Sequence, residues 1–212
     1  MIRRLFPFVL LSLLVACGDA KDDFDLLRGS LNRDAPRFHP RANALASLRP
    51  IPPRLEVGFP SRDLSGVMLL ETLRAGTETW LTADGATITL KGGMLTSAKG
   101  FGSGLSGSDI DQSLALVQAG RAGIAERFHS FLNGNDEIEL HAYRCEITPQ
   151  GREEIFVQGL AISVMNLEEA CFGSEQAFTN TYWLRPNSHE IIQSSQWTGD
   201  FLGNLFMKRV PE

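Results

Sequence analysis

Residue types that could do chemistry are present in this sequence, but their spacing does not complete a catalytic centre. Residues 104–108, Gly-Leu-Ser-Gly-Ser, approach the Gly-x-Ser-x-Gly motif of serine hydrolases and lack its last glycine. That motif places its serine on a strained turn between a strand and a helix. Here a polar gap separates the serine from the next expected helix, so we interpret the segment as a flexible loop. Asp109 and Asp111 suit the start of that helix, whose dipole favours negative charge. No phosphate loop or dinucleotide fingerprint occurs, and the sequence predicts neither a catalytic residue nor a cofactor.

Residues that could bind a metal ion are equally scattered. Asn133, Asn135 and Glu137 mimic part of a calcium loop, but the remaining ligands of such a loop are missing. The sequence has no Cys-x-x-Cys pair, and its histidines do not occur at ligand spacing. The four histidines could come together only through the tertiary fold; they are His39, His129, His141 and His189. We therefore predict no metal site.

The N-terminus carries a targeting signal. Residues 1–16 contain two arginines followed by a short apolar run, which is typical of a secretory signal peptide. The run is too short to span a bilayer as a helix, which needs about 20 residues. Its ending, Leu14-Val15-Ala16-Cys17, resembles the lipobox of bacterial lipoproteins. The resemblance implies cleavage before Cys17, diacylglycerol on its sulfur and an acyl chain such as palmitate on its amine. Gly18 rather than Asp follows the cysteine, which favours the periplasmic side of the outer membrane over retention in the inner membrane.

Two further cysteines remain, Cys145 and Cys171. An exported protein meets an oxidising environment, which favours a disulfide between them. Such a bond would close a loop of about 25 residues and contribute roughly 3–4 kcal/mol in the chain-entropy description. Two separate buried thiols are the alternative.

Composition places the chain among ordinary globular proteins. It has 212 residues, of which 43% are apolar and 21% charged, and a net charge of −5. Loss of Arg3 and Arg4 with the signal peptide would lower that charge from −5 to −7. An acidic protein of this kind is not expected to bind nucleic acid, because phosphate binding needs clustered Lys and Arg.

The expected organisation is a tether followed by a β-rich domain. Residues 17–53 are predicted to be an acylated tether with a helix near residues 22–31 and another near residues 41–48. A cluster of prolines, at positions 50, 52 and 53, then blocks further helix. Residues 54–212 read mostly as strands that alternate apolar and polar residues, with turns such as Asp84-Gly85.

The expected elements of that domain decide the predicted fold class. One helix is expected at residues 110–118, capped by Ser108 or Asp109. We also expect a turn at residues 149–151, a returning strand at residues 154–164, one helical turn at residues 166–170, and a hairpin at residues 178–197. Many strands with one or two short helices predict a mainly β fold, an antiparallel barrel, half-barrel or sandwich.

Aromatic and amide side chains on these strands suggest sugar binding. Aromatic rings can stack on the C–H face of a pyranose, and amides can bond its hydroxyls. The candidate glycan-binding residues are Trp80, Tyr182, Trp183, Gln196 and Trp197. The alternative is that the tryptophans are core residues whose N–H groups are paired.

Three stretches of the chain resemble the YjbF/GfcB family of lipoproteins from group 4 capsule and exopolysaccharide systems. They are residues 79–90 (TWLTADGATITL), residues 93–102 (GMLTSAKGFG), and Asn-Thr-Tyr-Trp-Leu at 180–184 with Ser-Ser-Gln-Trp at 194–197. The resemblance covers residues 54–206, and the lipobox and the two later cysteines also fit it. Ala98 and Gly104 depart from the usual pattern.

The resemblance implies a β-rich lipoprotein that acts near the outer membrane in polysaccharide production or secretion. We expect a non-enzymatic accessory, anchored to the membrane through Cys17, with the polysaccharide or its export proteins as partners. One alternative is a periplasmic glycan hydrolase or lyase, with Glu137, Glu139 and Asp200 as candidate carboxylates. Another is a carrier of lipid or lipoprotein, which would need an apolar cavity.

Overall fold

The computed structural model describes residues 39–102, 104–135 and 137–211. The predicted signal peptide, Cys17 and the predicted helix at residues 22–31 lie outside these ranges. The described residues form one compact unit. Neither helix within the described ranges is long and apolar enough to cross a membrane.

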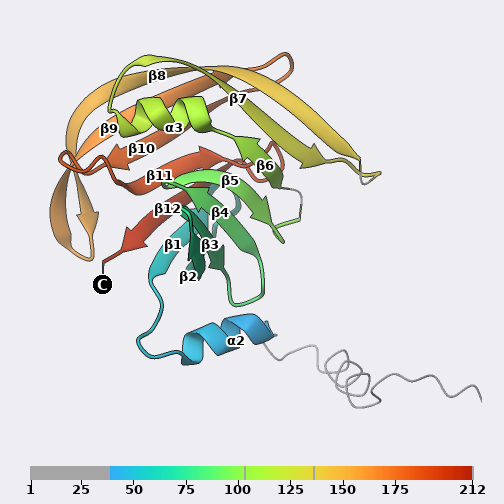
Figure 1. Ribbon diagram of the computed structural model, residues 1–212, viewed down its shortest axis with the longest axis vertical. Helices are drawn as coiled ribbons and strands as arrows, with labels where there is room; N and C mark the ends of the chain where they lie inside the picture. Colours follow the sequence, from blue (N-terminus) through green and yellow to red (C-terminus); the bar gives the residue numbers. More distant parts are fainter. Residues whose placement is uncertain (1–38, 103, 136, 212) are drawn as a thin grey trace, which may run out of the picture. The chain divides into compact units, whose positions relative to one another are not determined.

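The described residues form one antiparallel sheet that curls into a nearly closed barrel (Figure 1). This result confirms the predicted mainly β class. The strands are β1 (Arg54–Phe59), β2 (Leu64–Arg74), β3 (Thr77–Leu81), β4 (Thr87–Lys91), β5 (Met94–Lys99), β6 (Leu105–Asp109), β7 (Gly123–Leu132), β8 (Ile138–Val157), β9 (Leu160–Phe172), β10 (Ala177–Leu184), β11 (Ile191–Trp197) and β12 (Asn204–Val210).

The strand order follows the sequence apart from one junction. It runs β5-β4-β3-β2-β1-β12-β11-β10-β9-β8-β7-β6, so nearly every strand pairs with its neighbour in the chain. The exception is β1, which pairs with β12 from Arg54 opposite Val210 to Gly58 opposite Phe206. Strands β5 and β6, which are consecutive in the chain, form the two ends of the sheet. Hairpin turns therefore explain most of this topology, and the β1–β12 pair joins its two halves.

Two short α-helices and one 3-10 turn accompany the sheet in the described ranges. Helix α2 (Pro40–Ser47) is tied to β2 by an ion pair between Arg41 and Glu71, and the 3-10 turn η1 (Pro60–Arg62) joins β1 to β2. Helix α3 (Asp111–Gln118) lies beneath the curved strands β7 to β10 (Figure 1). Its first N–H donates to the Asp109 carboxylate at 3.2 Å, as the sequence suggested for that residue.

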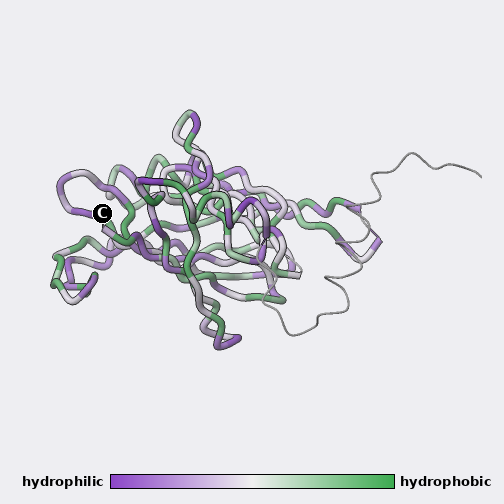
Figure 2. The backbone as a smooth tube through the Cα atoms, turned by 90° about the horizontal axis from the view of Figure 1, so that it is seen from below, coloured by the Kyte–Doolittle hydropathy of each residue, from purple (hydrophilic) through white to green (hydrophobic). Residues whose placement is uncertain are grey.

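The buried face of helix α3 packs against the strands that cover it and forms part of the hydrophobic core. Val117 lies in a cluster with Ile147 of β8, Leu167 of β9 and Met94 of β5. A second cluster surrounds Trp80 on the other half of the sheet. Figure 2 shows hydrophobic and hydrophilic residues interleaved along the strands, the pattern of a sheet with one face inward.

The β8–β9 hairpin differs from the sequence-based expectation. The predicted turn at residues 149–151 is wrong, because β8 continues through it to Val157 with an irregular register between Pro149 and Gly151. A bulge accommodates an extra residue and a proline that cannot donate a ladder hydrogen bond. The turn instead falls at Gln158 and Gly159, which both have positive φ (51° and 81°). Residues 166–170, expected as a helical turn, belong to β9.

Candidate functional site

The predicted glycan-binding residues lie mainly inside the barrel. Trp80, Tyr182, Gln196 and Trp197 are at most 6% exposed. They therefore present no ring face or amide to a glycan in this structure, and their hydrogen bonds and ring contacts are made within the protein. Trp183 keeps partial exposure, and its indole N–H donates to Glu153.

Each of these buried residues has an identifiable partner. The Trp80 indole N–H donates to Glu78 at 3.0 Å. Trp197 stacks on Phe178 with ring centroids 4.4 Å apart. Such contacts match the alternative that the sequence left open, in which the aromatic side chains belong to the core.

A fully buried ion pair lies at the centre of the interior. Arg127 of β7 donates to Glu169 of β9 at 2.7 Å, and both side chains are at most 1% exposed. The same Glu169 oxygen also accepts from the Asn180 amide at 2.7 Å and the Tyr182 hydroxyl at 2.6 Å. Arg127 donates in addition to the His129 ring at 2.9 Å. Three strands, β7, β9 and β10, are thereby tied through one carboxylate oxygen.

The protonation states of this cluster follow from burial and charge. Burial alone would raise the pKa of Glu169, but the adjacent Arg127 charge and the hydrogen bonds from Tyr182 and Asn180 together outweigh it and hold that pKa below its usual range. Burial would likewise lower the pKa of Arg127, and Glu169 keeps it raised. His129 has no anionic partner, so burial and the Arg127 charge lower its pKa to about 2. The cluster is thus an ion pair beside a neutral imidazole.

Gln196 of β11 bonds the backbone at the start of β5, a strand that lies elsewhere in the sheet. Its side-chain oxygen accepts from the Leu95 N–H at 2.7 Å, and its nitrogen donates to the Gly93 carbonyl and to Ser194, both at 3.0 Å. Because β5 ends the sheet, its backbone lacks a second strand partner. Gln196 supplies part of that missing pairing from β11, which gives this amide a structural task.

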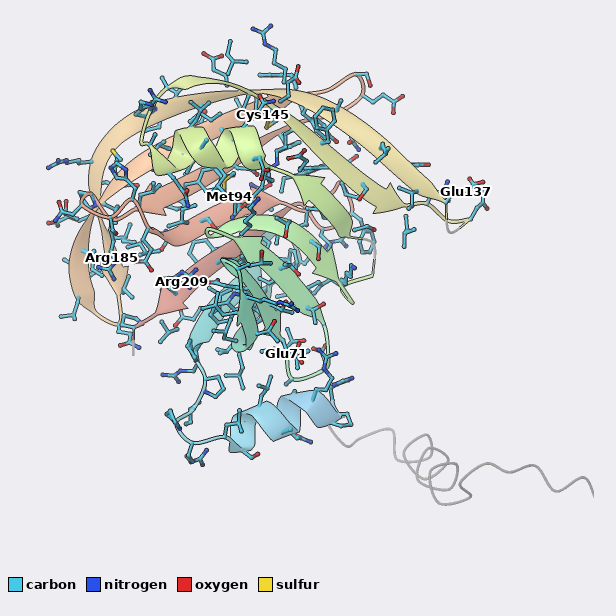
Figure 3. The ribbon with its side chains drawn as sticks, viewed as in Figure 1. Glu71, Met94, Glu137, Cys145, Arg185 and Arg209 are labelled. Atoms are coloured by element: carbon cyan, nitrogen blue, oxygen red, sulfur yellow. A yellow bond between two sulfur atoms is a disulfide. The ribbon has the colours of Figure 1, made fainter. Side chains whose placement is uncertain are left out.

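Cys145 and Cys171 face each other on β8 and β9 and are joined by a disulfide with an S–S distance of 2.01 Å. Figure 3 marks Cys145 on the upper strands. Glu169 lies close enough to complete a three-ligand group with the two sulfurs. Metal binding requires thiolates, and both sulfurs are already bonded to each other. The described residues thus offer no ready metal site at this position.

The other candidates from the sequence have ordinary structural partners. Asn133 accepts from the N–H groups of Asn135 and Glu137, which makes a turn at the tip of the β7–β8 hairpin. Its amide donates to Glu137 and Glu139, whereas Asp200 accepts from Gln176. The segment at residues 104–108 forms most of β6, and not a loop.

The histidines are partly brought together. His129 and His141 are opposite each other on β7 and β8. His39 accepts from the Arg41 N–H at the start of α2, and His189 lies against Gln118. Within the described ranges, no histidine belongs to a group with metal-binding geometry.

Arg127 and Glu169 are the residues that sequence reasoning missed. Charged side chains are usually exposed, and their types gave no reason to place them inside. A signal was nevertheless present, because Arg127 alternates with Ala125 and His129 on the inward face of β7. Glu169 does the same between Leu167 and Cys171 on β9. A charge flanked at i±2 by inward residues predicts a buried partner of opposite sign.

The fold and its interior together define a nearly closed antiparallel β-barrel filled by its own side chains and by α3. The chain belongs to the YjbF family, described as group 4 capsule polysaccharide lipoprotein, gfcB and YjbF, which it matches over residues 53–210. That membership confirms the family resemblance drawn from the three sequence stretches.

A crystal structure of the hypothetical lipoprotein YmcC from Escherichia coli K12 is similar, with a TM-score of 0.68 and 14% identity. The similarity covers 89% of this chain and 95% of that one. At this identity the likeness concerns the fold alone. None of the curated proteins matches the sequence significantly.

Proposed function

We propose that this protein is an outer-membrane lipoprotein, anchored through Cys17 on the periplasmic side, that acts as a non-enzymatic accessory in capsule or exopolysaccharide production or secretion. The observation that carries the proposal is the family match over residues 53–210. The lipobox ending at Cys17 supports the anchor. Two or more acyl chains hold a protein stably at a membrane, whereas one chain does so only marginally.

The filled interior favours an accessory over a lipid carrier. The hollow lined by Leu55, Leu90 and Met207, between β1, β4, β11 and β12, amounts to about 10 Å³. That is about the volume available to one water molecule and far too small for an acyl chain. Arg127 and Glu169 also bond to each other and to neighbouring protein groups, although Glu169 Oε1 and His129 Nδ1 have no hydrogen-bond partner among the described residues.

The organisation of the candidate carboxylates favours a non-enzymatic role. Glu137 and Glu139 come from one hairpin tip and share Asn133. Glycosidases need two carboxylates that flank a bound sugar at a defined separation. A hairpin tip with both groups on one amide offers no such cleft.

Deletion of the gene in polysaccharide-producing cells tests the proposal. We expect less polysaccharide at the cell surface, restored by the wild-type gene but not by Cys17→Ser. The Cys17→Ser protein should move from the membrane to the soluble fraction, whereas the matched tether variant Ser30→Ala should behave as wild type. Unchanged surface polysaccharide in the deletion strain would refute the proposed role.

A second assay addresses the enzyme alternative. Purified protein is incubated with the exopolysaccharide of the same cells, and new reducing ends and unsaturated uronates are measured. The accessory role predicts neither. Release of either product, lost on heat denaturation, would establish a hydrolase or lyase instead.

A further inference from the structure

Two adjoining surface hollows share the side chains of Arg209 and Glu190. The larger, about 530 Å³, is polar and is also lined by Glu78, Gln118 and His189. Its volume falls in the range of about 300–1,000 Å³ typical of ligand sites. The smaller, about 130 Å³, is partly apolar. We call the two together the Arg209 groove. Figure 3 shows Arg209 and Arg185 on the side of the domain opposite Glu137.

Arg209 is held rigidly in this groove. Its Nη2 donates to both Glu78 oxygens at 2.8 and 2.9 Å, and its Nε donates to the Ile191 carbonyl at 3.3 Å. The guanidinium also lies 5.9 Å from the Trp80 ring centroid. Among the described residues, no acceptor bonds Nη1. Nη1 is therefore a preorganised hydrogen-bond donor that a ligand in the groove could use.

Hydrogen-bond acceptors lie beside this donor. Glu190, whose side chain is 49% exposed, makes ion pairs with Arg185 at 3.3 Å and Arg209 at 4.0 Å. The Nδ1 atom of His189 lies 2.7 Å from the Gln118 carbonyl. Because a carbonyl only accepts, Nδ1 donates in this contact, and Nε2 is the ring nitrogen left to face a ligand. His189 also has φ of 54°, a backbone conformation uncommon outside glycine.

The chemistry of the groove fits a ligand with hydroxyl groups. A hydroxyl donates one hydrogen bond and accepts others, so it can bridge a guanidinium donor and a carboxylate acceptor. The two arginines and two glutamates of the groove balance in charge, which does not favour a strongly charged ligand. Val157, Ile162 and Ile192 line the smaller hollow and suit the C–H face or a methyl group of a sugar. Trp183 packs on the same apolar cluster.

We propose that the Arg209 groove binds a short stretch of neutral, hydroxyl-rich glycan. The inference rests on the proposed function, whose substrate class it names. It places the contact on Arg209, Glu190 and His189, away from the buried aromatic residues that the sequence suggested. The groove lies between β3, β12 and the β10–β11 turn.

Calorimetric titration of the full mature lipoprotein in detergent tests the groove. The probe is a set of oligosaccharides made by partial hydrolysis of the exopolysaccharide of the same cells. Saturable binding by the wild type is expected, weakened about tenfold or more by Glu190→Gln, since a hydrogen bond to a charged group is lost. Arg209→Lys keeps the positive charge but removes Nη1, and a similar loss is expected. The matched control is Glu175→Gln, at an exposed position outside the groove, which should bind as wild type.

Circular dichroism and thermal midpoints must first show that each variant is folded. No saturable binding by the wild type, or equal binding by Glu190→Gln and wild type, would overturn the glycan site. Reduced polysaccharide in the deletion strain without any binding would overturn the groove alone. Binding combined with unchanged polysaccharide in the deletion strain would overturn the proposed function and leave the groove standing.

Discussion

Breaking the buried ion pair should be among the most destabilising single changes in this barrel. Glu169→Gln keeps the shape of the side chain and can still accept hydrogen bonds, but it removes the negative charge 2.7 Å from Arg127. Arg127, itself 1% exposed, would then be a buried charge without a counter-charge. Removal of one partner from such a pair costs about 3–5 kcal/mol. Total stabilities are commonly about 5–15 kcal/mol, so a large share would be lost.

Urea unfolding followed by tryptophan fluorescence measures this loss, with the disulfide kept oxidised. The matched control is Glu168→Gln, the neighbouring exposed carboxylate on β9, which should change stability by no more than about 0.5 kcal/mol. The double variant Arg127→Met/Glu169→Gln removes both charges. It should be less destabilised than the sum of the single variants by about 1–3 kcal/mol, the coupling expected for contacting groups.

The pH dependence gives an independent check. Arg127 lowers the pKa of Glu169 in the folded protein, so its stabilising contribution is present above the unfolded pKa of about 4.3. The contribution is lost as pH falls through the lower, folded pKa. The gap between wild type and Glu169→Gln should thus be constant near neutral pH and shrink below about pH 4. A loss under about 1 kcal/mol at pH 7, equal to that of Glu168→Gln, would refute the account of the pair as a charged interaction.

Three further outcomes follow from the same interior. His129 stays neutral in the fold, with a pKa of about 2, but protonates below about 6.5 when unfolded. Wild-type stability should therefore fall by roughly 2 kcal/mol from pH 7 to 5; urea midpoints measure this, and a slope unchanged in His129→Gln would count against it. Replacing both Cys145 and Cys171 by Ala should cost about 3.5 kcal/mol by the loop-entropy relation, measured by urea unfolding, and no loss would mean that the bond does not restrain the unfolded chain. Gly93→Ala combines a positive φ of 85° with a Cβ 2.8 Å from Ile191, so it should lower the thermal midpoint, whereas Gly134→Ala meets nothing within 4 Å; equal midpoints would contradict the tight packing at the β4–β5 turn.

Local signals predicted most of the sheet because most strands pair with their neighbour in the chain. Asp84-Gly85 and the alternation at residues 86–90 predicted a hairpin that the structure contains as β3 and β4. Pro149 led to the wrong prediction of a turn at residues 149–151, because a proline in a bulge and a proline in a turn look the same in the sequence. The correct turn, at Gln158 and Gly159, lacks the Asn-Gly or Asp-Gly pair typical of such hairpins.

The candidate sites were harder to predict for a physical reason. The aromatic residues Trp80 and Trp197 alternate with polar neighbours, and a strand pattern alone does not say which face is enclosed. The Arg209 groove combines residues from β3, α3, the β10–β11 turn and β12. Their proximity depends on the curl of the sheet, which no local pattern encodes. Sequence reasoning left open whether these aromatic residues bind glycan or belong to the core, and the structure places Trp80 and Trp197 in the interior.

The pairing of β1 with β12 has a consequence for how this chain folds. Arg54 contacts Val210 across the middle of the sheet, although hairpins dominate the other pairings. Local hairpins form within microseconds in isolation, but contacts between distant parts of a chain are slow to form. A chain synthesised from its N-terminus can build β2 to β5 early, yet β1 has only β2 beside it until β12 is made. Its other edge stays open during that interval, and an open strand edge invites pairing with other chains. Completion of the barrel therefore waits for the last strand of the chain.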